Sequence, residues 1–309
     1  MKPLTYMPLL RGRQTELRLL HKAAPLIQRA DVIPVLEPVS AHTTMLEQLI
    51  DYYVKFEIPL AVVVNPAVGD FSVSSQHLLN RIGDQLRYTS QVFPVIRTSA
   101  GCINWSRLER AEKFALIGEG RPCSEIQSIL LNDRSRITYH IVESEVEPER
   151  AEQPLGKRVL LRDGFQRRRN VDYPPDEKFL SGPGRLDLQG ASGWGDYLIV
   201  GQEYQEGGGR PHAVAIHITY WASNGALRVH HYLSDSNDGP ADPAGKFAEA
   251  LGKLINDLDQ GVYPIAETSA IRCLRDLHKQ EHFPGLPSLK LLSMHHHLET
   301  VSRHFLNEE

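Results

Sequence analysis

This sequence lacks closely spaced cysteine pairs, long apolar runs and a large excess of either acidic or basic residues. Its three cysteines, Cys102, Cys123 and Cys273, contain no Cys-x-x-Cys spacing, so we expect neither a disulfide framework nor a zinc knuckle. No stretch approaches the roughly 18 consecutive apolar residues of a membrane helix. The formal net charge of −4 argues against a dedicated nonspecific DNA-binding protein, although a local basic patch would still allow nucleic-acid binding. We therefore expect a reduced, cytoplasmic protein that is not bound to a membrane.

Catalytic signatures are also missing. The sequence has no Gly-x-Ser-x-Gly nucleophile elbow, no His-Glu-x-x-His zinc motif and no phosphate-binding Gly-Lys-Ser/Thr loop. The run His295-His296-His297 falls in a segment with helical spacing, where consecutive side chains spread around the axis, so we assign it a structural role. No metal site is indicated, and the sequence does not determine a cofactor.

Short apolar runs that alternate with amphipathic stretches are the main pattern present. The intervening stretches repeat apolar residues at helical spacing, as in Leu17, Leu20, Ala24 and Ile27. Runs without polar alternation are typical of parallel strands that are buried on both faces. The eight runs are Met7–Leu10, Val32–Leu36, Pro59–Val64, Val92–Ile96, Phe114–Ile117, Ile137–Val142, Val159–Leu161 and Tyr197–Val200.

Eight runs favour a (β/α)₈ TIM-barrel-like domain over residues 1–260, with an open parallel sheet of seven or more strands as the alternative. Within this domain, Asn224-Gly225 predicts an antiparallel hairpin over 213–233. A helix is expected to begin with Asp242 as N-cap and Pro243 as first residue. Residues 261–309 are expected to form a helical extension packed on the barrel, with helices near 267–281 and 287–306.

Polar side chains follow nearly every apolar run. Because the carboxyl ends of barrel strands meet at one mouth, where barrel enzymes carry their sites, we expect these residues to gather there. The set comprises Glu37, Asn65, Arg97, Glu119, Glu143, Arg162 and Asp163. We predict Glu143 and Asp163 as acid–base candidates, and the other five as ligand-binding residues. The loop Arg167-Arg168-Arg169 adds guanidinium groups that match phosphate oxygens, and Arg169 joins the ligand-binding set. We expect Arg97, Arg162 and Arg169 to create a positive local potential that attracts an anionic or nucleotide ligand.

Six segments of the chain resemble the beta family proteins, a bacterial family named after a phage product. These segments are PLLRGRQTELRLL, VVVNPAVGDF, RDGFQRRRNVDYP, GWGDYLIVGQEY, GGGRPHAVAIHITY and SDSNDGPADPAGKFAEAL, spread over residues 8–258. The positions that match are Arg11, Gln14, Glu16, Asn65, Asp163, Arg169, Asp172, Asp196, His217 and Asp235. The resemblance adds Arg11 and His217 to the ligand-binding candidates. It implies a place in phage-related or defence modules and a neighbouring nuclease-like partner, but no established reaction.

Two functions follow from these features. The first is a barrel protein of a phage-related or anti-phage defence module that binds a ligand or partner. The alternative is a barrel enzyme that acts on a phosphorylated or nucleotide-like substrate by acid–base or metal-assisted hydrolysis. A weaker resemblance to glycerophosphodiester phosphodiesterase barrels lacks the required histidine and acid pair, because Leu10 and Glu37-Pro38-Val39 stand there.

Overall fold

The chain folds into two compact units in a computed structural model that describes residues 4–87, 89–118, 123–143, 155–180, 190–207 and 211–306. The first unit comprises Met1–Arg162 and Leu186–Tyr197, and the second comprises Asp163–Arg185 and Leu198–Glu309. The chain therefore passes from the first unit to the second, returns for one short segment, and leaves again.

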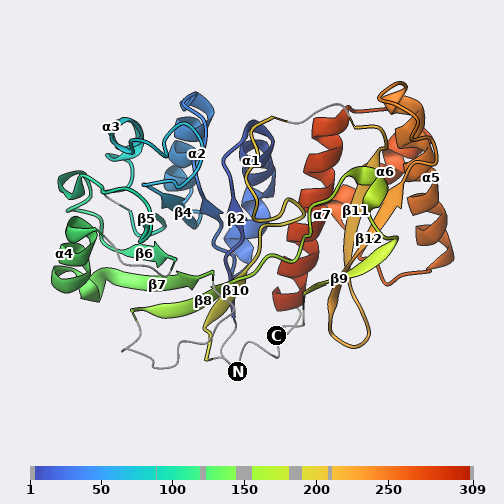
Figure 1. The fold of residues 1–309 in the computed structure, drawn as a ribbon. Helices are drawn as coiled ribbons and strands as arrows, with labels where there is room; N and C mark the ends of the chain where they lie inside the picture. Colours follow the sequence, from blue (N-terminus) through green and yellow to red (C-terminus); the bar gives the residue numbers. More distant parts are fainter. Residues whose placement is uncertain are drawn as a thin grey trace. The chain divides into compact units, whose positions relative to one another are not determined.

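A parallel sheet of nine strands forms the first unit (Figure 1). Its order is β1-β10-β8-β7-β6-β5-β4-β3-β2. The strands are β1 (Thr5–Tyr6), β2 (Leu9–Leu10), β3 (Val35–Leu36), β4 (Leu60–Val63), β5 (Val92–Arg97), β6 (Phe114–Ile117), β7 (Ile137–Val142), β8 (Lys157–Leu161) and β10 (Gly193–Gly195). The sheet is curled, since its two end strands, β1 and β2, are consecutive in the chain. Along this segment the Met7 amide donates to the Trp194 carbonyl and the Glu37 amide donates to the Leu10 carbonyl.

Helices follow only some of these strands. In the described part of the first unit, α1 (Gln14–Arg29) follows β2, α2 (Thr44–Lys55) follows β3, α3 (Gln76–Ile82) follows β4 and α4 (Ser124–Asn132) follows β6. The short 3-10 helices η1 (Trp105–Arg107) and η2 (Arg134–Arg136) lie in connections between strands. The structure thus confirms an α/β fold with a barrel-like parallel sheet, but the predicted TIM barrel with eight strand–helix repeats is wrong. The connection from β8 to β10 runs through the second unit instead of through a helix packed on the sheet.

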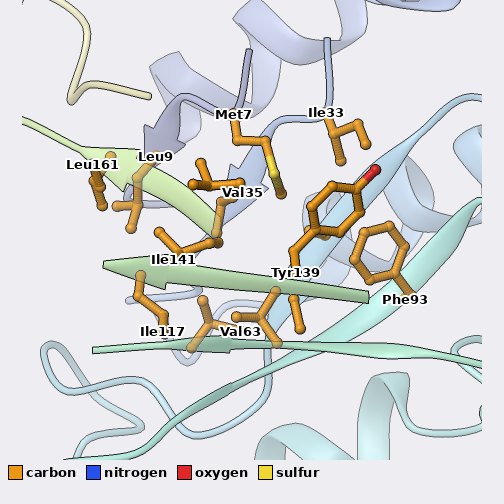
Figure 2. Packing of buried hydrophobic residues seen from close by; sticks show 14 of the residues in the cluster. Met7, Leu9, Ile33, Val35, Val63, Phe93, Ile117, Tyr139, Ile141 and Leu161 are labelled. Atoms are coloured by element: carbon orange, nitrogen blue, oxygen red, sulfur yellow. The ribbon is translucent and has the colours of Figure 1, made fainter. Parts of the chain in front are cut away.

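The interior of this sheet is filled by alternate residues of successive strands. Leu9, Val35, Val63, Val95 and Ile141 belong to one buried cluster, and Figure 2 shows four of these side chains by label, pointing into a common core. Side chains on a strand alternate between its two faces, and burial on both faces explains the unbroken apolar runs of the sequence. The strand predicted at Tyr197–Val200 was placed too late, because β10 is the glycine-rich segment before it.

An antiparallel sheet of three strands, in the order β11-β12-β9, begins the second unit (Figure 1). Its strands are β9 (Asp176–Leu180), β11 (Ala215–Trp221) and β12 (Leu227–Leu233), and the 3-10 helix η3 (Asn170–Asp172) precedes β9. The predicted hairpin is confirmed. Gly225 has a φ of +75° and its amide donates to the Ala222 carbonyl, a conformation that asparagine–glycine turns favour. The polar, proline-flanked β9 was not predicted.

Three helices complete the second unit: α5 (Pro243–Gln260), α6 (Ser269–Lys279) and α7 (Leu286–Leu306). The predicted N-cap is confirmed, because the Asp242 carboxylate accepts from the Gly245 amide at 2.9 Å. Ile216 and Tyr232 of the hairpin pack with Leu254 and Leu274 of the helices in one core. The hairpin therefore shares its core with the C-terminal helices, although we had assigned it to the same domain as the parallel strands.

The consecutive histidines of α7 are buried and have structural contacts. His296 bridges the Thr268 hydroxyl at 2.9 Å and the Thr219 carbonyl at 2.7 Å, and His297 lies 3.2 Å from the Thr219 hydroxyl. Burial lowers the pKa of His296 to about 4, so this ring is neutral in the fold at neutral pH. These contacts attach α7 to β11.

Two of the cysteines come together despite their spacing in the sequence. Cys102 and Cys123, 21 residues apart, form a disulfide with a Cα–Cα distance of 6.3 Å. The expectation of fully reduced cysteines is corrected here, because folding brings the loop after β5 next to the start of α4. No helix in the described part of the chain is both long enough and apolar enough to cross a membrane.

Candidate functional site

A polar layer lies at the carboxyl ends of the parallel strands in the first unit. Apart from one tyrosine, each of its residues stands two positions after an inward-facing apolar residue: Arg11 after Leu9, for example, and Glu37 after Val35. The strand alternation therefore carries these side chains to the same interior side as the apolar core. The layer consists of Arg11, Glu37, Asn65, Arg97, Glu143 and Tyr197.

Glu37 is the centre of this layer and is fully buried. Its carboxylate accepts from Arg97 Nε at 2.7 Å and from Arg97 Nη2 at 3.1 Å, and it also pairs with Arg11. The Ala67 amide donates to it at 3.0 Å. Burial acts to raise the pKa of Glu37, but the two guanidinium groups and this amide outweigh burial and lower it.

Arg97 links Glu37 to Glu143, the most exposed of the charged groups in the layer. Arg97 Nη1 lies 3.1 Å from one Glu143 oxygen, and the Tyr197 hydroxyl donates to the other at 2.9 Å. The Glu143 side chain is 22% exposed, whereas that of Arg97 is 6% exposed. Burial acts to lower the pKa of Arg97, but the carboxylates of Glu37 and Glu143 raise it. Burial, followed by Glu143, raises the pKa of Tyr197 above its ordinary value.

Within this network the charges cancel. Two guanidinium groups face two carboxylates, and Arg97 uses its Nε, Nη1 and Nη2 atoms on them. Such a network costs desolvation energy and stays stable only when its hydrogen bonds are complete. Arg97 is thus committed to its partners inside the layer, although we had expected it to supply a positive potential for an anion.

Asn65 holds the neighbouring backbone in place. Its amide nitrogen donates to the carbonyls of Arg97 at 2.9 Å and Gly101 at 3.0 Å, and its oxygen accepts from the Arg97 amide at 2.8 Å. These three bonds connect the ends of β4 and β5. Asn65 therefore sets the position of Arg97 through the backbone.

A cavity of about 170 Å³ opens beside Asn65. Hydroxyl and amide groups dominate its lining, which comprises Asn65, Pro66, Phe71, Ser72, Val73, Ser74, Ser75, Gln76, Gly101, Cys102 and Asn104. The lining contains no aspartate, glutamate, lysine, arginine or histidine, and its one cysteine is in the disulfide. This cavity suits an uncharged polar ligand group with several donors and acceptors.

Two of the remaining predicted site residues, Arg162 and Asp163, bond to backbone groups. Arg162 donates to the backbone carbonyls of Val142 and Leu161 in the first unit. Asp163 belongs to the second unit, where its carboxylate accepts from the amides of Phe165 at 3.1 Å and Gln202 at 2.9 Å. Glu119 falls outside the described residues.

Two further predicted ligand-binding residues are also in the second unit. Arg169 is exposed and pairs with Asp172 at 2.7 Å. His217 lies on β11, where its Nδ1 atom is 2.7 Å from Nδ1 of His231. The structure thus brings together Arg11, Glu37, Asn65, Arg97 and Glu143, while Asp163, Arg169 and His217 are in the other unit.

Sequence reasoning missed Tyr197 and the cavity lining at 71–76. Tyr197 stands two residues after Gly195 of β10, so the alternation would have found it had that strand been recognised. Residues 71–75 lie in a loop that no apolar periodicity marks, and Gln76 begins α3. Asp196, one of the positions of the family resemblance, is also buried and accepts from the Tyr6 hydroxyl at 2.9 Å.

Comparison of the chain with protein-family models, curated proteins and solved structures finds no match.

Proposed function

We propose that this protein binds a ligand with an uncharged, hydroxyl-bearing part, such as the nucleoside moiety of a nucleotide, in the cavity beside Asn65. The observation that carries the proposal is the separation of charge from the cavity. The ionisable groups of the polar layer are hydrogen-bonded to one another, while the cavity presents serine hydroxyls and side-chain amides. Hydroxyl and amide groups bind sugars and nucleobases through neutral hydrogen bonds.

Binding is a better match to this geometry than acid–base catalysis. General acid–base catalysis needs a titratable group within hydrogen-bond reach of the reacting atom. Glu37 has both oxygens occupied by guanidinium groups, and its lowered pKa makes it a poor proton acceptor at neutral pH. The polar layer then serves to hold the carboxyl ends of the strands, and with them the cavity wall, in a fixed arrangement.

The enzymatic alternative depends on Glu143. This carboxylate is partly exposed and contacts Tyr197, so it is the group of the layer best placed to meet a substrate. Hydrolysis of a phosphorylated or nucleotide-like substrate would be lost in Glu143→Gln if this alternative holds.

For the biological setting, we propose a cytoplasmic, phage-related or anti-phage defence module with a nuclease-like partner. The resemblance to the beta family proteins supports this setting, and the polar cavity is compatible with a nucleotide signal or substrate in it.

Thermal unfolding of the full chain with adenosine, AMP or glucose tests the proposed ligand class. We expect adenosine and AMP to raise the melting temperature to a similar extent, because the cavity recognises the neutral part of the ligand. A ligand at about 100 times its Kd stabilises a fold by roughly 2.7 kcal/mol. Glucose alone raising the melting temperature would indicate a sugar ligand in place of a nucleoside and would contradict the nucleoside assignment.

Ser74→Tyr places a large side chain at the exposed lip of the cavity and should abolish the stabilisation. His77→Tyr is the matched control, because His77 is also exposed but does not line the cavity. The proposal is wrong if Ser74→Tyr retains the full effect, or if none of the three compounds stabilises the unmodified chain.

A further inference from the structure

Two histidines face each other across the β11–β12 pair of the second unit. His217 is registered opposite His231, and their Nδ1 atoms are 2.7 Å apart. Two ring nitrogens at this distance share one proton, so one ring donates and the other accepts.

Glu177 on β9 decides which ring donates. One of its oxygens lies 3.1 Å from His231 Nε2, and Arg168 contacts the two carboxylate oxygens at 2.6 and 3.0 Å. A carboxylate paired with a guanidinium group acts only as an acceptor. His231 Nε2 must therefore carry a proton and donate it to Glu177.

The remaining protonation states follow from this bond. In neutral His231 the proton on Nε2 leaves Nδ1 as an acceptor, so His217 Nδ1 must donate to it. Because neutral His217 carries its proton on Nδ1, its Nε2 atom has a free lone pair that can accept a hydrogen bond. In the described part of the chain, no hydrogen bond to His217 Nε2 is found.

Aromatic rings pack against the His217 ring. The rings of Phe165 and Tyr173 meet His217 at centroid distances of 5.0 and 4.8 Å, both edge-on, and Tyr173 also stacks on His231 at 4.6 Å. These contacts fix the orientation of the His217 ring, which is half-buried. We propose that Glu177, His231 and His217 form a hydrogen-bond relay that makes His217 Nε2 a hydrogen-bond acceptor for a hydroxyl-bearing ligand.

The relay transmits the hydrogen-bond direction set by Glu177 to His217, and both rings stay neutral. This adds to the proposed ligand binding a hydrogen-bond-accepting site in the second unit.

The charged and titratable groups around the pair agree with neutral rings at rest. Burial, followed by His231, lowers the pKa of His217 well below its ordinary value. Burial lowers the pKa of His231 to about 4, against the opposing effect of Glu177, while His230 and Arg168 contribute to the lowering. Tyr173, whose pKa is raised by burial, is also neutral at pH 7.

Nitrogen-15 NMR of the full chain at pH 7 reads the tautomers directly. We expect His217 in the Nδ1–H form, the less common tautomer of free histidine, and His231 in the Nε2–H form. His217 in the Nε2–H form would overturn the proposal.

The rate of reaction with diethyl pyrocarbonate reports whether His217 Nε2 has this lone pair. The unprotonated nitrogen attacks a carbonyl carbon, the bond to the bridging oxygen breaks, and ethyl carbonate leaves. In Glu177→Gln, Arg168 offers only donors and therefore binds the amide oxygen of the new side chain. The amide NH₂ then donates to His231 Nε2, so His231 Nδ1 carries the proton and donates it to His217 Nδ1. His217 Nε2 then carries the proton of its own ring and loses its lone pair. We expect carbethoxylation of His217, mapped by mass spectrometry, to fall about tenfold, as the loss of one charge-assisted hydrogen bond implies.

Asp172→Asn is the matched control, because Asp172 also pairs with an arginine of this loop, Arg169, at the surface. It should leave both the His217 tautomer and its reactivity unchanged. Unchanged reactivity of His217 in Glu177→Gln would overturn the relay.

Discussion

At the residue scale, Glu37 is the side chain on which the polar layer of the first unit depends. It is fully buried and is paired with both Arg11 and Arg97. Breaking a buried ion pair by removing one partner is far more costly than losing an exposed pair, because it leaves a charge without compensation.

We therefore expect Glu37→Gln to lower the free energy of unfolding at pH 7 by about 3 kcal/mol, measured by urea denaturation. The pKa of Glu37 is lowered in the fold, so its contribution is present above the unfolded value of roughly 4.3 and disappears as the pH falls through the folded value. The difference in the free energy of unfolding between the two proteins should accordingly begin to narrow as the pH falls below roughly 4.3, because the unfolded chain takes up this proton first.

Asp84→Asn provides the comparison for this measurement. Asp84 pairs with Arg87 at 2.9 Å, but its side chain is 76% exposed. Its loss should cost less than about 1 kcal/mol. Equal costs for the two substitutions would mean that the Glu37 network does not stabilise the fold.

At the element scale, β10 depends on glycine. A Cβ at Gly195 would overlap the Met7 carbonyl oxygen, and one at Gly193 would lie 2.5 Å from the Thr5 carbonyl oxygen. The two glycines thus allow β10 to approach the segment that contains β1. Tyr197 follows directly and reaches Glu143, so this close approach also positions part of the polar layer.

Gly195→Ala should lower the free energy of unfolding by about 1–3 kcal/mol, since the backbone must move to relieve the overlap. Gly252→Ala in α5 is the control, because a Cβ there meets no atom within 4 Å. Alanine should raise stability at this helical position by about 0.5–1 kcal/mol. If Gly195→Ala leaves the free energy of unfolding unchanged in the same denaturation experiment, β10 can move away from β1 without loss of stability.

At the scale of the whole molecule, each unit has its own apolar core. Ile117 belongs to the core of the first unit and Leu274 to that of the second, and neither is exposed to solvent. Units with separate cores unfold in separate transitions when each is stable by itself.

We expect calorimetry to resolve two transitions, with Ile117→Ala and Leu274→Ala each lowering the melting temperature of a different one. Each truncation removes buried methyl groups and should cost about 2–5 kcal/mol in its own unit. One shared transition that both variants shift equally would show that the two units unfold together.

The sequence by itself determined most of the parallel strands and several of the helices. Unbroken apolar runs and helical stripes are local patterns, and they located β4–β8, α1 and α5–α7 to within a few residues. The same patterns placed Glu37, Asn65, Arg97 and Glu143 at strand ends, because the residue two positions after an inward side chain faces inward as well.

Only the tertiary structure decided how these elements are grouped. The sequences of β10 and β9 show no apolar run that predicts a strand. β10 forms because its glycines allow close approach to the segment that contains β1, and β9 forms because it pairs with β12. The insertion of 163–185 into the second unit, the Cys102–Cys123 pair and the His217–His231 contact all depend on segments distant in the chain. Local periodicity reports which face of an element is buried, but the partner that buries it is chosen by long-range packing.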